Sequence, residues 1–312
     1  MFHRNPPQRW VLYAQLLLEN RVNLMAQSTR PAYLLVGTVT KDLLPNNLFT
    51  IGGTVSYAGV VVKQLGWRPV IVTAAAPDFV PPVYLDDADW RILPSPATTT
   101  FRNVYTPQGR QQTVGPIARS IGPDDIPSDC RNISLVHLCP LAQDVEAAVT
   151  QVFENSLVVT TPQGWLRQWD ANGIVSLGDW QGSAEILPRV QATVISIEDI
   201  EGDWAIAEKW AAQTSILIVT QDREGCTVFH QGQRWTIPPR PAQPVDPTGA
   251  GDVFAAAFFI RFHETDDLGQ SAYFANVTAS MAIEREGPEG APLRSEVDAY
   301  VDQHPFVKSR PG

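Results

Sequence analysis

Short apolar runs that alternate with helical segments constrain the fold of this 312-residue chain more than any other feature. Four such runs follow residue 130, at 135–138, 157–160, 192–197 and 216–220. Helical spacing of apolar residues fills the stretches between them, as at 143–153 and 204–213. Runs of this kind are typical of buried parallel strands, and their alternation with helices predicts a mostly parallel sheet with helices on both faces. We therefore expect an α/β fold.

The two ends of the chain add further elements to this sheet. Strands are expected at 33–37 and 69–74, and a helix at 54–65 follows a pair of glycines and ends at Gly66. Towards the C-terminus we expect a hairpin at 227–237. Two helices then finish the chain, at about 250–263 and 267–285.

Residues 98–117 differ from the rest, because their alternating pattern predicts a two-stranded hairpin with a polar face. A lone hairpin is only marginally stable, so we expect it to lie on the main body as a flap, together with strands near 38–50. The predicted organisation is an N-terminal extension, 1–30, outside the core, followed by a single domain, 31–312, that carries this flap.

Charge and cysteine content limit the partners and the compartment. Lysine and arginine number 23 against 33 aspartates and glutamates, a net charge of −10, which disfavours bulk binding to nucleic acid or to an anionic membrane. The apolar runs fall far short of the ~20 residues of a membrane span. Three cysteines cannot all pair and lack zinc-binding spacing, so we expect reduced thiols and a cytoplasmic location.

The segment 246–252 (Asp-Pro-Thr-Gly-Ala-Gly-Asp) carries the clearest chemical signal. The residues after it, 253–260, are apolar all round, so they predict a buried helix whose N-terminus is held rigidly. The glycines let a ligand approach the backbone, and the unpaired N–H groups and the helix dipole favour negative charge there. The segment therefore predicts an anion hole.

Asp252 lies in the first turn of this predicted helix. A carboxylate beside a phosphate site is well placed to take a proton from a hydroxyl that attacks a phosphoryl group. The alternative is structural, with Asp252 as a partner of the helix dipole and Asp246 or Thr248 as a cap. From the residues alone, both interpretations stay open.

The segment 246–252 with its apolar helix resembles the C-terminal signature of the ribokinase/PfkB carbohydrate kinase family. Other segments are similar to that family in the right order: the strand and aspartate at 37–42, the Gly52-Gly53 pair with its helix, the strand and turn at 219–225, and the helix around Asn276. The resemblance covers about residues 33 to 295. Residues 161–169 look most like the inositol-kinase-like side of the family.

The resemblance implies a ribokinase-like three-layer sandwich with a small β lid, and the transfer of the γ-phosphoryl of ATP, with Mg²⁺, to a hydroxyl of a sugar, polyol or nucleoside. Asp252 would be the general base, and Gly249, Ala250 and Gly251 would supply backbone donors. The implied substrate-side residues are Asp42, Gly52, Gly53, Ser56, Gln163 and Arg167. The implied nucleotide-side residues are Thr220, Asp222, Gly225, Thr248 and Asn276, with Asp199 towards the metal.

Gln163 and Arg167 also stand out without the resemblance, because they follow a predicted strand at the sheet edge where open α/β sheets bind ligands. The alternative interpretation is structural: the segment only begins a helix, and its arginine is exposed to solvent.

Three departures from the family pattern bear on activity. No asparagine follows the glycine pair, which leaves Ser56 or Tyr57 for its role; Ser196 stands where asparagine is usual; and Asp222 replaces a glycine. They motivate an alternative function, a non-catalytic ligand-binding or scaffold protein on the same fold. A Rossmann oxidoreductase is disfavoured because no strand is followed by G-x-G-x-x-G. Since an exposed two-sided sheet invites covering, we also consider a homodimer through the flap.

Overall fold

The computed structural model describes residues 30–106 and 109–306. The chain divides into two compact units, Met1–Pro31 and Ala32–Gly312, which are treated separately. Almost all of the first unit lies outside the described residues, so the predicted extension 1–30 stays a prediction.

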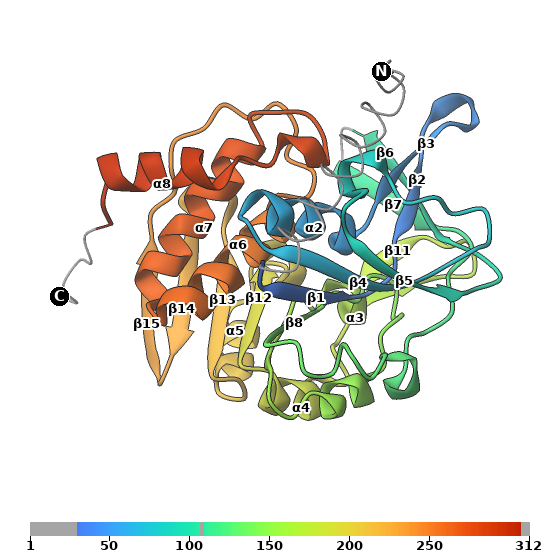
Figure 1. Cartoon of the computed structure of the whole chain (residues 1–312), viewed down its shortest axis with the longest axis horizontal. Coiled ribbons are helices and arrows are strands. Elements are labelled where there is room, and N and C mark those ends of the chain that lie inside the picture. Colours follow the sequence, from blue (N-terminus) through green and yellow to red (C-terminus); the bar gives the residue numbers. More distant parts are fainter. Residues whose placement is uncertain (1–29, 107–108, 307–312) are drawn as a thin grey trace, which may run out of the picture. The chain divides into compact units, whose positions relative to one another are not determined.

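The second unit is built around a nine-stranded sheet in the order β15-β14-β13-β12-β9-β8-β1-β4-β5 (Figure 1). Its strands are β1 (Ala32–Val36), β4 (Arg68–Ala75), β5 (Asp89–Pro94), β8 (Leu135–Leu138), β9 (Leu157–Thr160), β12 (Ala192–Ser196), β13 (Ile216–Thr220), β14 (Cys226–His230) and β15 (Gln233–Ile237). All neighbours pair parallel except β13 with β14 and β14 with β15, which form the C-terminal hairpin. The predicted mostly parallel sheet is confirmed.

Helices cover both faces of this sheet, which confirms the three-layer arrangement (Figure 1). One face carries α2 (Thr54–Gln64), α6 (Ala250–Thr265), α7 (Leu268–Ala282) and α8 (Arg294–Gln303), and the other carries α4 (Ser183–Ile186) and α5 (Trp204–Ala211). A short α3 (Gln163–Leu166) follows β9. The 3₁₀ helices are η1 (Pro45–Asn47), η2 (Val83–Leu85), η3 (Pro123–Asp125), η4 (Ala147–Val152), η5 (Leu187–Arg189), η6 (Ile197–Ile200), η7 (Asp222–Glu224) and η8 (Pro288–Gly290).

Helix α6 lies between its neighbours α2 and α7 and the sheet, which explains why it is apolar all round. Every side chain from Val253 to Ile260 is buried, at 3% exposed or less. The predicted burial is confirmed. Because the helix is fixed on all sides, its N-terminus cannot move without disturbing the core.

A separate four-stranded sheet, in the order β3-β2-β6-β7, forms the predicted flap. Its strands are β2 (Thr40–Leu43), β3 (Phe49–Gly52), β6 (Thr99–Thr106) and β7 (Gly109–Val114). The small hairpin of β10 (Arg167–Trp169) and β11 (Val175–Leu177) contacts β7. On the inner face, Phe101 and Val114 are buried against Leu141 and Ala142, so the flap has a small core of its own. The outer face exposes Phe49 and Val104, and the flap homodimer stays a prediction.

The predicted helix at 143–153 is wrong, since only the 3₁₀ helix η4 forms there. The buried carboxylate of Asp144 explains the difference. It accepts hydrogen bonds from the backbone N–H groups of Leu141 (2.6 Å) and Ala142 (3.0 Å), and from the backbone and hydroxyl of Thr38. These bonds hold the chain in an irregular loop. They also fix Thr38, which lies between β1 and the first strand of the flap.

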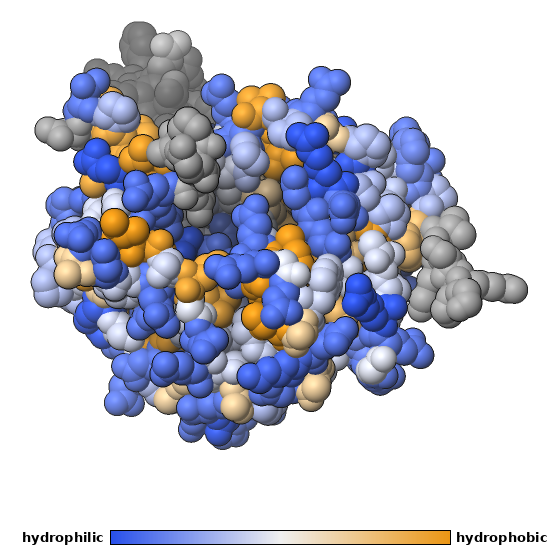
Figure 2. Space-filling model, turned by 180° about the vertical axis from the view of Figure 1, so that it is seen from behind, coloured by the Kyte–Doolittle hydropathy of each residue, from blue (hydrophilic) through white to orange (hydrophobic). Residues whose placement is uncertain are grey.

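Figure 2 shows that the face opposite to that of Figure 1 is mostly hydrophilic, with hydrophobic residues in small separate groups. Within the part of the chain that the structure describes, no helix is long and apolar enough to cross a membrane. The three cysteines are buried and unpaired, in keeping with reduced thiols. The cytoplasmic location stays a prediction.

A buried histidine lies in the centre of the sheet, on β8. The ring nitrogens of His137 lie 3.1 Å from the hydroxyl of Tyr33 and 3.1 Å from that of Thr161. Complete burial lowers the pKa of His137 to about 3, so the ring is neutral at physiological pH.

We predict that this histidine makes the fold sensitive to acid. The unfolded chain binds the proton with a pKa of about 6.5, whereas the folded chain does not, so stability is lost as pH falls below 6.5 towards 3. Between pH 7 and pH 5 this histidine should cost about 2 kcal/mol of unfolding free energy. His137→Gln should remove that share of the pH dependence in urea titrations at the two pH values. An unchanged pH dependence would show that the folded chain protonates His137.

Candidate active site

A cleft of about 1000 Å³ runs along the carboxyl ends of the parallel strands. Its lining comes from the flap, from the N-terminus of α6, and from α7 with the loop from 239 to 249. Helix α6 lies between the flap strands on one side and α7 on the other (Figure 1). The chain segments that follow β9, β12 and β13 also contribute to the lining. This is the edge at which open α/β sheets bind ligands.

The N-terminus of α6 is open towards the cleft. Gly249 caps the helix with φ +76°, and the backbone N–H groups of Gly249, Gly251 and Asp252 have no partner within the described chain. The prediction for Ala250 is wrong, because its N–H donates to the carbonyl of Pro247 (3.2 Å) in the first turn. A Cβ on Gly249 would lie 2.2 Å from the ring of Tyr57, whereas a Cβ on Gly251 would meet nothing within 4 Å. These unpaired donors and the open space around Gly251 suit a phosphoryl group.

Asp252 lies beside these donors and lines the cleft. Burial raises the pKa of its carboxyl to about 6, and a hydrogen bond from the Thr54 side chain and the positive charge of Arg167 oppose part of that rise. A carboxylate with a pKa near 6 is ionised at neutral pH and is more basic than an ordinary aspartate. Such a group can accept a proton from a hydroxyl.

Arg167 is only 7% exposed, so the alternative of a solvent-exposed arginine at a helix start is wrong. Its guanidinium donates to the carbonyl of Leu141 (3.0 Å) and to Oε1 of Gln163 (2.7 Å), and it lies over the ring of Phe101 at 5.1 Å. The structure thus brings Gln163 and Arg167 together in the lining of the cleft, and their contact with substrate stays a prediction. They place a fixed positive charge between the flap and Asp252.

Asp42 lines the cleft from strand β2, and its carboxylate accepts a hydrogen bond from the hydroxyl of Thr40 (3.0 Å). A Cβ on Gly52 would lie 2.2 Å from that carboxylate, so a glycine is needed where β3 passes Asp42. Gly53 lines the cleft and has φ +90°, a conformation that favours glycine.

Ser56 does not reach the cleft. The prediction that it contacts substrate is contradicted, because its side chain is fully buried and its hydroxyl donates to the carbonyl of Gly52 (2.8 Å). Tyr57, the alternative to Ser56 in the sequence prediction, lines the cleft instead. A one-residue shift along a helix turns the side chain by about 100°, which sequence spacing at a helix start did not resolve.

The part of the cleft away from the flap holds the residues predicted to face the nucleotide, and we call it the donor end. The turn after β13 forms one wall of it. Thr220, Asp222 and Gly225 all line the cleft. Asp222 has φ +48°, a left-handed conformation that aspartate tolerates, and its exposed carboxylate lies 4.0 Å from the guanidinium of Arg223. A Cβ on Gly225 would lie 2.2 Å from the carbonyl of Ile237, so this turn depends on its glycine.

The opposite wall of the donor end comes from α7 and the loop that precedes α6. Asn276 donates to the carbonyls of Ile237 (3.2 Å) and Pro238 (3.0 Å), so this predicted nucleotide-side residue holds the loop in place while lining the cleft. Thr248 also lines the cleft, and its backbone N–H donates to Asp246 (2.9 Å).

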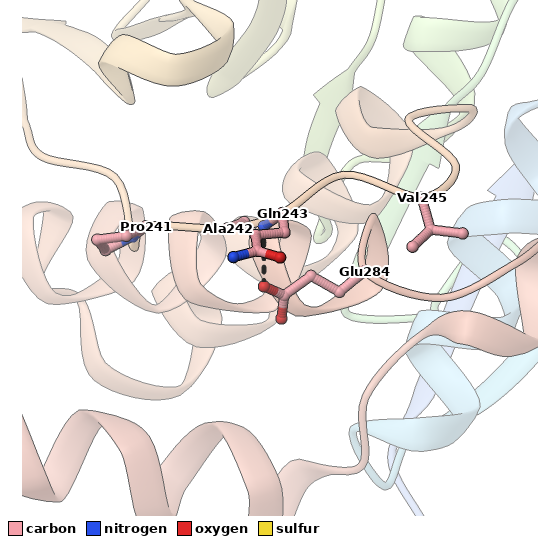
Figure 3. Close-up of a pocket in the computed structure, with 5 residues that line it drawn as sticks. All are labelled: Pro241, Ala242, Gln243, Val245 and Glu284. Carbon is pink, nitrogen blue, oxygen red and sulfur yellow. Dashed lines mark hydrogen bonds between the residues drawn. The ribbon is translucent and has the colours of Figure 1, made fainter.

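A second, open hollow of about 610 Å³ adjoins this loop (Figure 3). Glu284 is one of its lining residues, and its carboxylate accepts from the backbone N–H of Gln243 (3.1 Å) and pairs with Arg240 (3.0 Å). Both carboxylate oxygens are therefore used to hold the loop against the end of α7. The hollow continues the donor end of the cleft, since the two share three lining residues: Pro241, Ala242 and Gln243.

Asp199, predicted to face a metal, is used mainly within the protein. One carboxylate oxygen accepts from the backbone of Ser196 (2.8 Å), which caps η6, and the other accepts from Gln163 (3.3 Å). Its neighbour Glu198 is exposed and lines the cleft. Among the described residues, no three metal-ligating side chains lie close enough together to hold an ion.

Sequence reasoning missed several side chains that line the cleft. They are Glu198 after β12, Asn103 and Gln112 on the flap, and Arg240 before α6, together with Thr54, whose side chain bonds Asp252. Only alternation along the flap strands could have indicated Asn103 and Gln112.

Comparison with known proteins agrees with this arrangement. Residues 191–294, which include the Asp252 segment and helices α6 and α7, match the model of the pfkB family of carbohydrate kinases. This match, over 104 of the 312 residues, makes the chain similar to that family. The chain is 36% identical over 97 residues to ribokinase of Bacillus subtilis and 38% identical over 133 residues to inositol 3-kinase of Zea mays. The matches cover 31% and 42% of this chain but only 33% and 34% of those two relatives.

Solved structures confirm the ribokinase-like fold over most of the chain. A pyrophosphate-dependent kinase in the ribokinase family, complexed with a pyrophosphate analog and myo-inositol, has a TM-score of 0.72 and 20% identity, covering 86% of this chain and 99% of that one. Ribokinase from Thermotoga maritima has a TM-score of 0.64 and 18% identity, covering 86% and 99%. At these identities the likeness establishes the fold alone.

Proposed function

We propose that this chain transfers a phosphoryl group to a hydroxyl of a sugar or cyclic polyol. The observation that carries the proposal is the position of Asp252, an aspartate with a raised pKa, beside the open N-terminus of α6 in the middle of a long cleft. One end of the cleft suits a small polar acceptor and the other a larger donor. The match to the pfkB family model and the ribokinase and inositol 3-kinase among its relatives support the same class of reaction.

The reaction follows from the order of these groups along the cleft. The acceptor hydroxyl gives its proton to the Asp252 carboxylate as its oxygen attacks the terminal phosphorus of the donor. The oxygen–phosphorus bond to the leaving phosphate breaks as the new one forms. The backbone N–H groups of Gly249 and Gly251 stabilise the charge on the transferring group, and each such donor is typically worth about 3 kcal/mol of barrier. Arg167 holds the acceptor end positively charged and orients Gln163.

We propose ATP as the donor. Several structural neighbours are pyrophosphate-dependent kinases, so pyrophosphate is the second candidate. The shape of the cleft favours ATP, because it continues past the N-terminus of α6 along Asn276, Ala279 and Ile283 of the α7 end. Pyrophosphate would leave that part of the cleft empty, whereas a nucleoside would fill it.

The residues present fit Mg²⁺ bound mainly through donor phosphates and water. Glu198 and Asp222 line the donor end, and each leaves carboxylate oxygens exposed there. Two separated carboxylates suit a Mg²⁺ ion that keeps several waters, rather than a cage made by the protein. When bound, the ion would neutralise charge on the phosphates.

We propose a polyhydroxy acceptor rather than a nucleoside. A nucleobase binds best against an open aromatic face, but the ring of Phe101 is covered by Arg167 and that of Tyr57 packs against Gly249. The side chains that remain at the acceptor end are polar, and include Asp42 and Gln163. Such groups suit the hydroxyls of a polyol. The inositol 3-kinases among the relatives support the same acceptor class.

The pKa of Asp252 predicts how the rate depends on pH. Because the base must be ionised, kcat/KM should be constant above about pH 7 and fall tenfold per pH unit below pH 6. Since the Thr54 side chain lowers this pKa, Thr54→Val should move the acid limb to higher pH. Initial rates from pH 5 to 9 test this. A limb that Thr54→Val does not move would instead report titration of the donor phosphate.

The function is tested by measuring phosphorylated product from ATP or pyrophosphate, with Mg²⁺, against myo-inositol, ribose, fructose and adenosine. We expect turnover with ATP and a polyol or sugar. Preferred turnover with pyrophosphate or adenosine would overturn the donor or acceptor assignment. Binding of ATP and a polyol without product, under every condition, would instead support a non-catalytic ligand-binding protein.

A further inference from the structure

The inner face of the flap carries two polar side chains with no role assigned so far, Asn103 and Gln112. Alternation along β6 and β7 points both into the cleft, in the same row as each other, because Asn103 pairs with Gln112 across the two strands. The row towards the body of the protein holds Phe101, which pairs with Asp42 on β2 and with Val114 on β7. Asn103 is the next residue after Phe101 on the same face of β6, so the two amides lie further from the body of the protein than Asp42.

The two amides form a pair. Nε2 of Gln112 donates to Oδ1 of Asn103 at 2.9 Å, and within the described chain neither side chain makes another hydrogen bond. An amide carries two N–H donors and one carbonyl acceptor, so this pair retains the N–H groups of Asn103 beside the carbonyl of Gln112. Exchanging the roles of the two amides leaves the same combination. The pair thus offers a donor and an acceptor side by side, both half-buried and lining the cleft.

A donor next to an acceptor on one rigid pair is complementary to two adjacent hydroxyls. One hydroxyl can donate to the carbonyl of Gln112 while its neighbour accepts from an N–H group of Asn103. Mutual hydrogen bonding restricts the rotamers of both amides, so little further entropy is lost on binding. A single hydroxyl or an apolar group would leave the free N–H groups of Asn103, the carbonyl of Gln112, or both without a hydrogen-bond partner.

We propose that the Asn103–Gln112 pair binds a vicinal diol of the acceptor and so determines which hydroxyl lies against Asp252. The proposal rests on the proposed function, which makes Asp252 the base. The pair lies on the flap and Asp252 on α6, so they bound the acceptor from different elements of the cleft. In a ring that carries a hydroxyl on every carbon, fixing two adjacent hydroxyls at the flap fixes the orientation of the ring. The pair therefore sets the position that is phosphorylated.

Gln112→Leu and Asn103→Leu test this, with Gln111→Leu as the matched control. Gln111 is the same residue type, one position earlier on β7, and is exposed on the outer face of the flap. With myo-inositol and ATP, the wild type and Gln111→Leu should give one positional isomer of the monophosphate, identified by phosphorus and proton NMR. Each inner-face variant should raise KM for myo-inositol about tenfold and place about a tenth or more of the product at another position.

An unchanged isomer and an unchanged KM in both inner-face variants would overturn the proposal, while the kinase activity itself would stand. If the wild type shows no turnover, calorimetric binding of myo-inositol replaces it as the readout. Binding weakened in Gln112→Leu but not in Gln111→Leu would then support the diol site even though the proposed function fails. No binding by the wild type would overturn both. Melting temperatures of all variants show whether the flap has kept its fold.

Discussion

Replacing Asp252 with asparagine is expected to lower kcat by about 10²-fold or more. The amide has nearly the same shape as the carboxyl group but cannot take the proton of the acceptor hydroxyl. Donor and acceptor binding should stay close to that of the wild type, because the open N–H groups of α6 are kept. Steady-state rates, with calorimetric titration of ATP and of the acceptor, measure the two effects separately.

Stability provides the control for this variant. Burial raises the pKa of Asp252 from its usual 3.8 to about 6, because the ionised carboxyl is disfavoured in the folded state. The free energy of unfolding therefore falls as pH rises from 3.8 through about 6. Asp252→Asn should therefore melt at an equal or higher temperature than the wild type at pH 8, and lose that advantage near pH 4. A variant with normal turnover would show that another group is the base. A variant that is inactive and less stable at pH 8 would point to the structural role of a helix-dipole partner.

Substitution of the glycines at the start of α6 should give two different outcomes. Gly249→Ala places a Cβ 2.2 Å from the ring of Tyr57 and requires φ +76° of a non-glycine residue, so the cap must move. We expect a lower melting temperature together with a fall in kcat/KM of about 10²-fold, since a shift of about 1 Å in positioning groups has effects of that size. Circular dichroism melts and steady-state rates measure both.

Gly251→Val is the contrasting variant, because a Cβ there meets nothing within 4 Å and points into open space. The fold should tolerate it, whereas the branched side chain would crowd the approach of the phosphate. We expect a melting temperature close to that of the wild type, with weaker ATP binding and slower turnover. Unchanged ATP affinity and rate in Gly251→Val would refute the anion hole at this helix.

Much of the fold followed from sequence because its signals are local. The central strands are continuous apolar runs, and helix α6 has no polar face, so burial on every side was the simplest consequence. The loop around Asp144 could not be predicted in this way. Its conformation depends on hydrogen bonds to Thr38, 106 residues earlier in the chain, and those bonds outweigh the local helical spacing.

The candidate site shows the same division. Asp252 and its glycines lie within one short motif, so their common location was predictable. The prediction that Ser56 contacts substrate was wrong because a one-residue difference on a helix decides whether a side chain faces the core or the cleft. Asn103 and Gln112 were missed because their pairing depends on the register of β6 and β7, which only the folded hairpin establishes. The exposure of Glu198, which lies between the N-cap Ser196 and Asp199, likewise depends on how η6 begins.

The most direct test of the account is transfer of radiolabelled phosphoryl from γ-labelled ATP to a panel of inositols and sugars, with wild type and Asp252→Asn assayed side by side. We predict one labelled polyol or sugar phosphate with the wild type, formed about 100-fold or more slowly by the variant. Label that stays on ATP with every acceptor, or equal transfer by the two proteins, would contradict it.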